Sequence, residues 1–139
     1  MTKDSEGDKG QLVGSGTFRI ERKIALEKLQ KYQFQDPWDF VRCWLRAAVL
    51  QGASHVKVVS DVSLSSISFD GRPFGENLLR DPYFDLFASE DESSEAGHQL
   101  AIGLLGCLHF EPRRVQLCSG HGAARRRWTR SMDGDEELD

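Results

Sequence analysis

The sequence has no apolar run long enough to span a lipid bilayer, and polar residues follow Met1 where a secretory signal peptide would be apolar. It has only three cysteines, an odd number that does not fit a disulfide framework. Its formal net charge of −4 leaves no excess of basic residues to neutralise nucleic-acid phosphates. We therefore expect a cytoplasmic protein with reduced thiols, no membrane segment and no nucleic-acid partner.

With 139 residues, 39% hydrophobic and 29% charged, the chain fits one globular domain. Residues 1–16 are polar and rich in glycine, so we expect a flexible arm there. Residues 132–139 are mostly acidic and follow a basic run at Arg125–Arg127, which predicts a solvated tail whose charges screen those of the arginines. The folded domain is expected over residues 17–131.

A strong helix-start signal lies in the sequence Asp-Pro-Trp-Asp at residues 36–39. Asp36 can cap the first turn, and Pro37 suits the first helical position. Apolar residues then recur at helical spacing up to Gly52, which can adopt the positive φ of a C-terminal cap. The other predicted elements are strands at 17–20, 55–59, 66–69, 115–118 and 124–129, helices at 21–33 and 100–108, short helical turns at 76–87 interrupted at Pro82, and a mobile acidic loop at 89–97.

This order of elements predicts an α+β fold, a two-layer sandwich in which a mixed, largely antiparallel sheet carries helices on one face. Three segments are characteristic: residues 47–53 (AAVLQGA), 67–71 (ISFDG) and 101–105 (AIGLL). In this order and spacing, they resemble the Bergerat fold of the GHKL ATPases, the family of gyrase, heat-shock chaperones, histidine kinases and MutL. The resemblance covers residues 40–129 and implies a histidine-kinase-like ATPase domain. No Gly-Thr strand closes its sheet as in the family, so the resemblance implies either a fragment or a trimmed domain.

The residues that perform hydrolysis in that family are missing. There, a helical Glu orients the attacking water, an Asn ligates Mg²⁺ and an Asp lies on the same face. We match the family motif to this chain at the Gly52-Ala53 turn, which follows the helix that starts at residues 36–39. The corresponding residues are then Cys43, Ala47 and Leu50. A thiol is a poor base for water, and Ala offers no oxygen ligand to Mg²⁺. The resemblance therefore implies a pseudo-ATPase with no catalytic residue and no Mg²⁺; the alternative, which we favour for these three side chains, is that they are buried core.

The nucleotide contacts of the family are only partly retained. Arg72 and Phe74 stand where the family has glycines beside the adenine, although the preceding Asp could accept a hydrogen bond from an exocyclic amine. Glycines in the last helical segment match those whose neighbouring amides approach phosphates. The residues that the resemblance places at ATP or ADP are Asp70, Gly71, Gly103 and Gly106. An Asp-Gly pair after a strand is also an ordinary turn signal, and we favour that structural role for Asp70.

Two other groups contain residue types that are often functional. Cys107, His109, Cys118 and His121 are zinc-ligand types, but their spacing is not that of paired zinc ligands, so we expect buried thiols and surface histidines without a metal. The aromatic residues Trp38, Trp44, Phe84 and Phe87 could form a docking surface. Trp44 is in phase with the core, whereas Phe84 and Phe87 either pack under the acidic loop or contact a partner.

Three functions remain open from the sequence. The first, which we expect, is a degenerate GHKL-like domain that binds a protein partner or holds a nucleotide weakly without hydrolysing it. The second is an active ATPase in which Glu76, Asp81 or the loop acids at 90–95 replace the missing residues. The third is a small interaction domain unrelated to nucleotides.

Overall fold

The computed structural model describes residues 21, 23–26, 28–29, 36, 38–89 and 91–139, which belong to two units, residues 1–35 and 36–139. In the first unit, the described residues between Glu21 and Leu29 are helical, as predicted for that segment. The predicted arm and the predicted strand at 17–20 lie outside the described residues. The account below concerns the second unit.

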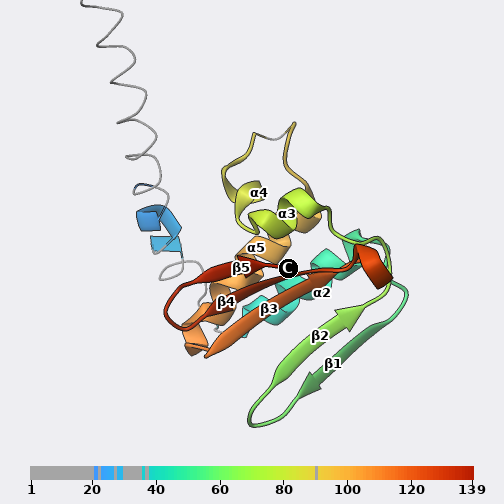
Figure 1. Cartoon of the computed structure of the whole chain (residues 1–139), viewed down its shortest axis with the longest axis horizontal. Helices are drawn as coiled ribbons and strands as arrows, with labels where there is room; N and C mark the ends of the chain where they lie inside the picture. The colour runs from blue at the N-terminus through green and yellow to red at the C-terminus, as the bar shows by residue number, and fades with distance from the viewer. Residues whose placement is uncertain (1–20, 22, 27, 30–35, 37, 90) are drawn as a thin grey trace, which may run out of the picture. The chain divides into compact units, whose positions relative to one another are not determined.

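The second unit is an α+β domain, as the sequence predicts (Figure 1). In the described part of this unit, two strands follow the first helix, three helices then follow one another, and the remaining strands come last; the two short helices lie on either side of Pro82 as expected. The elements are α2 (Asp39–Leu50), β1 (Val56–Ser60), β2 (Ser65–Phe69), α3 (Glu76–Arg80), α4 (Phe84–Phe87), α5 (Glu95–Cys107), the 3₁₀ turn η1 (Leu108–Phe110), β3 (Arg114–Ser119), the 3₁₀ turn η2 (Gly122–Ala124), β4 (Arg126–Ser131) and β5 (Glu136–Leu138).

The described strands form two separate antiparallel sheets, not one mixed sheet. β1 and β2 form a hairpin in which Val58 lies opposite Ile67. β4 lies between β3 and β5 in the second sheet, so Trp128 is opposite Leu117 on one side and Leu138 on the other. No helix in the described part of the chain is long and apolar enough to cross a membrane.

β5 lies within the segment that we expected to be a solvated acidic tail. Its three residues pair with β4 because the adjacent Asp139 is attached to that strand through both backbone and side chain. The backbone N–H of Arg127 donates to Asp139 O at 2.8 Å, and the N–H of Asp139 donates back to Arg127 O at 2.9 Å. The Arg127 guanidinium also donates to the Asp139 carboxylate, with an Nε–Oδ1 distance of 3.1 Å. The arginines therefore do more than screen the acidic residues, because one of them attaches the segment as a strand.

α2 begins later than the sequence predicts: its N-cap is Trp38, which makes no side-chain cap hydrogen bond, so the expectation that Asp36 caps the helix is wrong, and Pro37 lies outside the described residues. Asp36 accepts a hydrogen bond from the N–H of Trp38 at 3.0 Å, which stabilises the turn just before the helix begins at Asp39. Gly52 ends the helix with φ of 77°, as predicted. Its N–H donates to Val49 O at 2.9 Å, and the N–H of the next residue, Ala53, donates to the carbonyl of Ala48 at 3.0 Å. This pair of bonds is a Schellman cap, which satisfies two carbonyls at the helix end.

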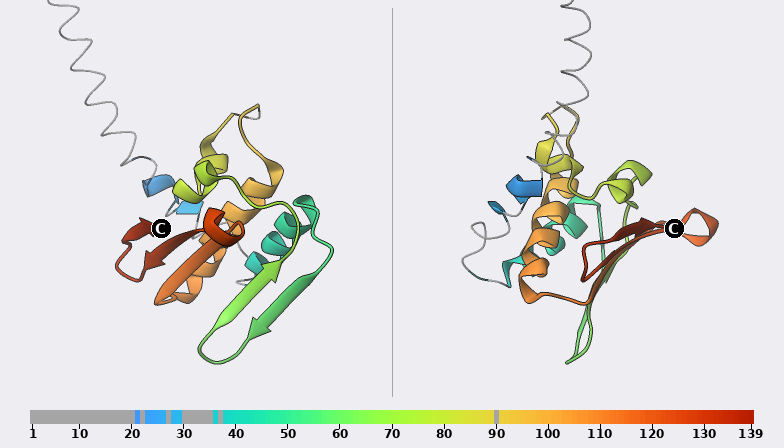
Figure 2. Two further views of the ribbon diagram at one scale, coloured as in Figure 1. Left: turned by 45° about the vertical axis from the view of Figure 1, so that its right-hand side comes forward. Right: turned by 60° about the vertical axis from the view of Figure 1, so that its left-hand side comes forward.

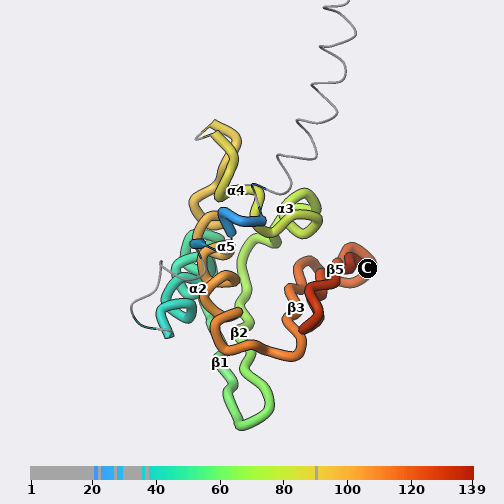
Figure 3. The backbone as a smooth tube through the Cα atoms, turned by 90° about the vertical axis from the view of Figure 1, so that its left-hand side faces the viewer, coloured from blue at the N-terminus to red at the C-terminus, as the bar shows by residue number. Residues whose placement is uncertain are grey.

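α5 begins earlier than the sequence pattern predicts, at Glu95, so the acidic loop is shorter than expected. Ser94 caps the helix, and its hydroxyl oxygen accepts a hydrogen bond from Gly97 N at 3.0 Å. α5 packs along α2 in the core, where Ala47, Ala48 and Ala101 have no exposed surface. Figures 2 and 3 show these two helices side by side, on one side of the three-stranded sheet.

Candidate functional site

The carboxylate of Asp70 is bonded by its own chain. Its Oδ1 accepts hydrogen bonds from the backbone N–H groups of Ser54 and His55, both at 2.8 Å, and its Oδ2 accepts from the Ser54 hydroxyl at 2.5 Å. The Ser54 hydroxyl contributes most, and together these donors lower the pKa of Asp70 to about 2. Asp70 therefore connects the end of β2 to the residues that lead into β1, which is the structural role favoured from the sequence.

Gly71 allows the loop after β2 to lie against the end of α2. Its φ is 110°, and a Cβ at this position would lie 2.6 Å from Gln51 O. The N–H of Arg72 donates to the same Gln51 oxygen at 2.9 Å, and the Arg72 guanidinium donates to Leu50 O at 3.1 Å. The Asp70-Gly71 pair thus belongs to a junction between α2 and the β1–β2 hairpin.

Gly103 lies where α5 packs tightly against α2. A Cβ on Gly103 would lie 2.4 Å from the ring of Trp44 and 3.1 Å from Phe40 O. The indole Nε1 of Trp44 donates to Leu100 O at 3.2 Å, which fixes the ring in this position. Gly106 is also buried on α5. Both glycines are therefore part of the packed helix, and Trp44 covers Gly103 where the family resemblance implies an approach to phosphates.

The N-terminus of α5 has an anion supplied by the chain itself. Asp85 of α4 is only 9% exposed, and its two carboxylate oxygens accept hydrogen bonds from the N–H and the hydroxyl of Ser94, both at 3.2 Å. A Cβ on Gly97 would lie 1.6 Å from Asp85 Oδ2, so the carboxylate occupies the space beside the first turn. Helix N-termini attract anions because their N–H groups are unpaired and the helix dipole is positive there.

The importance of Asp85 was not apparent from the sequence. Asp85 and Ser94 are separated by the acidic loop, and no local spacing rule relates them. The available signal was the Ser-Glu pair at residues 94–95, which is typical of a helix start and would have placed the first turn of α5 correctly.

The three α2 positions that correspond to the ATPase residues differ in burial. Cys43 is 7% exposed and Ala47 is fully buried, as the core interpretation predicts. The pKa of the Cys43 thiol is raised, mainly because the thiol is buried, so it stays protonated and neutral. Leu50 is 40% exposed, so the expectation that it is buried is wrong. It is the last residue of α2, beside the exposed turn at Gly52.

The four residues of zinc-ligand type, Cys107, His109, Cys118 and His121, do not form a metal site in the described part of the chain. No group of three or more Cys, His, Asp or Glu side chains in the described ranges is arranged to hold a metal ion. Cys107 is buried as expected, its thiol donates to Leu104 O at 3.1 Å, and burial raises its pKa to about 12. Cys118 is exposed on β3, contrary to the expectation of a buried thiol, because its side chain points to the outer face of the sheet. His109 and His121 are exposed as expected.

Aromatic residues are divided between core and surface. The ring of Trp44 packs edge-on against Phe40, with 5.1 Å between the ring centroids, in agreement with its predicted core position. Trp38 is 59% exposed and lies over Phe110, with 4.8 Å between the centroids. Phe84 and Phe87 of α4 are 44% and 39% exposed.

The β1–β2 hairpin exposes an apolar face that we expected to be covered by helices. Val56 lies opposite Phe69, and Val58 lies opposite Ile67, so the four side chains share one face. Val58 is 53% exposed, and every residue of β1 belongs to the exposed class. The alternating pattern revealed this face, but periodicity alone does not show whether another layer covers it.

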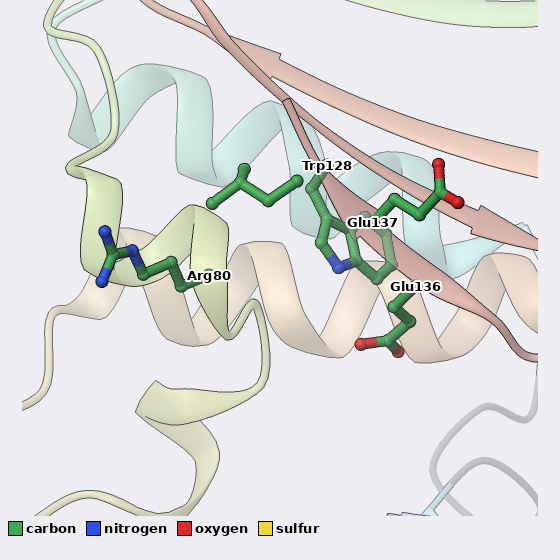
Figure 4. A pocket seen from close by; sticks show the side chains of 5 residues that line it. Arg80, Trp128, Glu136 and Glu137 are labelled. Atoms are coloured by element: carbon green, nitrogen blue, oxygen red, sulfur yellow. The ribbon is translucent and has the colours of Figure 1, made fainter.

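A cavity of about 250 Å³ lies between α3 and the strands β4 and β5 (Figure 4). It is smaller than typical small-molecule sites, which span roughly 300–1,000 Å³. Its lining residues are Arg80 of α3, Trp128 of β4, and Glu136, Glu137 and Leu138 of β5. None of these residues was selected from the sequence as part of a site.

Asp70 and Gly71 thus lie at the junction between α2 and the β1–β2 hairpin, where they contact other residues of the chain. Gly103 and Gly106 are buried in the packed helix α5. Comparison with known proteins finds no matching family model, no matching curated protein and no matching solved structure.

Proposed function

We propose that the chain is a degenerate GHKL-like domain that acts as a non-hydrolysing protein-interaction module. The observation that carries this proposal is the position of Trp44. Its ring lies so close to Gly103 that a Cβ added there would be only 2.4 Å from it. A phosphate could approach the backbone there only if this ring moved and lost its bond to Leu100 O. The bonded carboxylate of Asp70 supports the same conclusion at the adenine position.

The role as an interaction module is supported by the apolar face of the hairpin. Two-stranded hairpins are marginally stable in water, and an apolar face on such a hairpin gains free energy when another surface covers it. Exposed, contiguous apolar patches on folded domains commonly mark contacts with other proteins. Val56 and Val58, which lie on this face, are 38% and 53% exposed, so β1 offers such a patch.

The proposal is tested by heating the protein with and without 10 mM Mg-ATP. A ligand at one hundred times its Kd stabilises the native state by about 2.7 kcal/mol, which raises the Tm of a domain of this size by several degrees. We expect Mg-ATP to raise the Tm by less than about 1 °C, because the Asp70 carboxylate is already hydrogen-bonded and Trp44 already covers Gly103. A larger shift that disappears in Asp70→Asn would replace this proposal with nucleotide binding.

The alternative function, an active ATPase, can be tested with the same protein samples. Its substitute residues would include Glu76, whose carboxylate accepts a hydrogen bond from the Arg80 guanidinium at 2.8 Å. Phosphate release measured with Mg-ATP should stay at the level of a buffer blank. Turnover that is lost in Glu76→Gln would establish hydrolysis and refute the proposal.

A further inference from the structure

The outer edge of β1 carries backbone groups that the hairpin itself does not use. At the tip, the N–H of Asp61 donates to Leu64 O at 2.8 Å. At the base, the N–H of Asp70 donates to His55 O at 3.4 Å. Bonded and non-bonded pairs alternate along an antiparallel ladder, so the odd-numbered residues of β1 bond to β2 and the even-numbered ones face away from it. The N–H and C=O groups that face outward are those of Val56, Val58 and Ser60.

This edge of β1 is open. Figures 1 and 2 show β2 on the side of the hairpin nearer the three-stranded sheet and β1 on the outer side. Every residue of β1 is exposed, whereas β2 contains the half-buried Ile67 and Phe69. No strand among the described residues pairs with the outer edge of β1, and the strand has no proline or bulge to protect it. Exposed edges of this kind are templates for the addition of another strand.

The order of charges along β1 makes the strand complementary to itself. Lys57 lies near its start, and Asp61 follows its last residue. Antiparallel pairing of two identical strands sets the start of one against the end of the other, so each Lys57 meets the Asp61 of the second copy. Parallel pairing in register would set lysine against lysine. Neither side chain forms an ion pair within the part of the chain that the structure describes.

The Asp61 carboxylate is ionised and can bind a cation of another chain. Its Oδ1 accepts hydrogen bonds from the backbone N–H groups of Ser63 at 2.7 Å and Leu64 at 2.9 Å. These bonds, with that from Ser63 contributing most, lower the pKa of Asp61 below its usual range. The turn thus holds the carboxylate at the end of β1 through Oδ1, so Oδ2 can accept from a lysine.

The charges also select a register. When Lys57 lies directly opposite Asp61 of the second copy, the two-fold axis passes beside Val59, which lies opposite its own copy. Val58 then lies opposite Ser60 of the second copy, and both have outward-facing backbone groups, so each such pair exchanges two hydrogen bonds. With the axis at Lys57, the two lysines would lie opposite each other. With the axis at Val58, each lysine would be diagonal to both the lysine and the aspartate of the second copy, so attraction and repulsion would offset each other.

We propose that the outer edge of β1 binds the β1 strand of a second copy of this chain, so that the two hairpins form one four-stranded antiparallel sheet. The interface consists of backbone hydrogen bonds, of the contact between the two Val59 side chains, and of two ion pairs between Lys57 and Asp61. A sheet of four strands also gives the hairpin the support that two strands lack. This inference rests on the proposed function as an interaction module, for which it names the surface and the partner.

The test begins with the mass and the amide exchange of the whole chain in solution. Sedimentation equilibrium between about 5 µM and 1 mM should show a monomer that converts to a dimer and to nothing larger, because a two-fold interface is closed. In the ¹⁵N-labelled chain at the higher concentration, hydrogen exchange at the amides of Val58 and Ser60 should slow. Exchange at Ile67, which faces outward from β2, should not change.

Two substitutions and a control address the contacts of the dimer. Val58→Pro removes an N–H that β2 does not use, so the hairpin can form but the added strand loses a donor, and association should weaken at least about tenfold. Lys57→Glu sets like charges opposite each other at two symmetric places and should weaken association roughly tenfold. Arg113→Glu, an exposed substitution with the same change in net charge, should leave the dimer Kd unchanged.

Crosslinking tests the register in a chain whose exposed Cys118 is replaced by serine. Opposite residues of a non-hydrogen-bonded pair have Cα atoms about 4.5 Å apart, within the range of disulfides, so Val59→Cys should crosslink two chains under mild oxidation. Val58 is diagonal to its copy, about 7–8 Å away, so Val58→Cys should crosslink at least about tenfold more slowly. The proposal is overturned by a chain that stays monomeric at 1 mM, by a dimer in which Val58 and Ser60 are not protected, or by faster crosslinking of Val58→Cys.

Mg-ATP added to the same labelled sample separates the two proposals. If the chain stays monomeric and ATP also leaves the spectrum unchanged, the dimer assignment fails while the non-hydrolysing module stands. If ATP shifts the peaks of α2 and α5, the proposed function itself fails, whatever the mass of the protein.

Discussion

Substituting Gly103 with alanine tests whether this glycine serves helix packing. The new Cβ would lie 2.4 Å from the Trp44 ring, well inside van der Waals contact, so the ring or the helix must shift. Overpacking of this kind costs about 1–3 kcal/mol, whereas replacing glycine in a helix interior gains about 1 kcal/mol. We therefore expect Gly103→Ala to lower the free energy of unfolding by up to ~2 kcal/mol.

The clash can be isolated by a double-mutant cycle with Trp44→Leu, which removes the indole ring. In that background, the two contacts with the indole are lost and the tight contact of 3.1 Å to Phe40 O stays, so Gly103→Ala should be neutral or stabilising by up to ~1 kcal/mol. The assay is urea unfolding followed by circular dichroism, and the expected coupling between the two sites is about 1–3 kcal/mol. Equal effects of Gly103→Ala in both backgrounds would refute the packing role of Trp44.

Three further predictions follow from burial and charge. The pKa of Asp70 is about 2, lower than in the unfolded chain, so the ionised carboxylate stabilises the fold above pH 4 and this effect is lost as the pH falls toward 2. In urea unfolding between pH 5 and 2, Asp70→Asn should therefore lose less stability than the unmodified protein. Leu79→Ala should cost about 2–5 kcal/mol in the same assay because Leu79 is 2% exposed, whereas Val58→Thr should stay within about 0.5 kcal/mol if the hairpin face is open. A thiol reagent at pH 8 should modify Cys118 in the native protein and reach Cys107 only after unfolding, which mass spectrometry of digested samples would detect.

The parts of the fold that depend on local signals could be predicted from the sequence. The cap at Gly52 requires only a residue that tolerates positive φ, and the break at Pro82 requires only the missing N–H of proline. The β1–β2 hairpin follows from two alternating segments joined by a turn, in which Asp61 Oδ1 accepts hydrogen bonds from Ser63 N at 2.7 Å and Leu64 N at 2.9 Å.

Features that depend on contacts between distant residues could not be predicted in this way. β5 has too few residues to show alternation, and its pairing depends on the attachment of Asp139 to Arg127. The division of the strands into two sheets is a matter of tertiary arrangement, to which periodicity is insensitive. The structural role of Asp70 could be anticipated from its local sequence, but the contact of Trp44 with Gly103 could not, because the two residues lie on different helices.

The carboxylate of Asp85 gives the N-terminus of α5 an anion that cannot dissociate. A helix end that binds a free anion is empty or occupied according to the concentration of that anion, and the occupied fraction can serve as a signal. In this domain, the anion is covalently part of the chain and is held by both the N–H and the hydroxyl of Ser94. The junction of α4 and α5 should therefore keep one geometry at any phosphate concentration, so that this end of the domain behaves as a constant support and not as a switch.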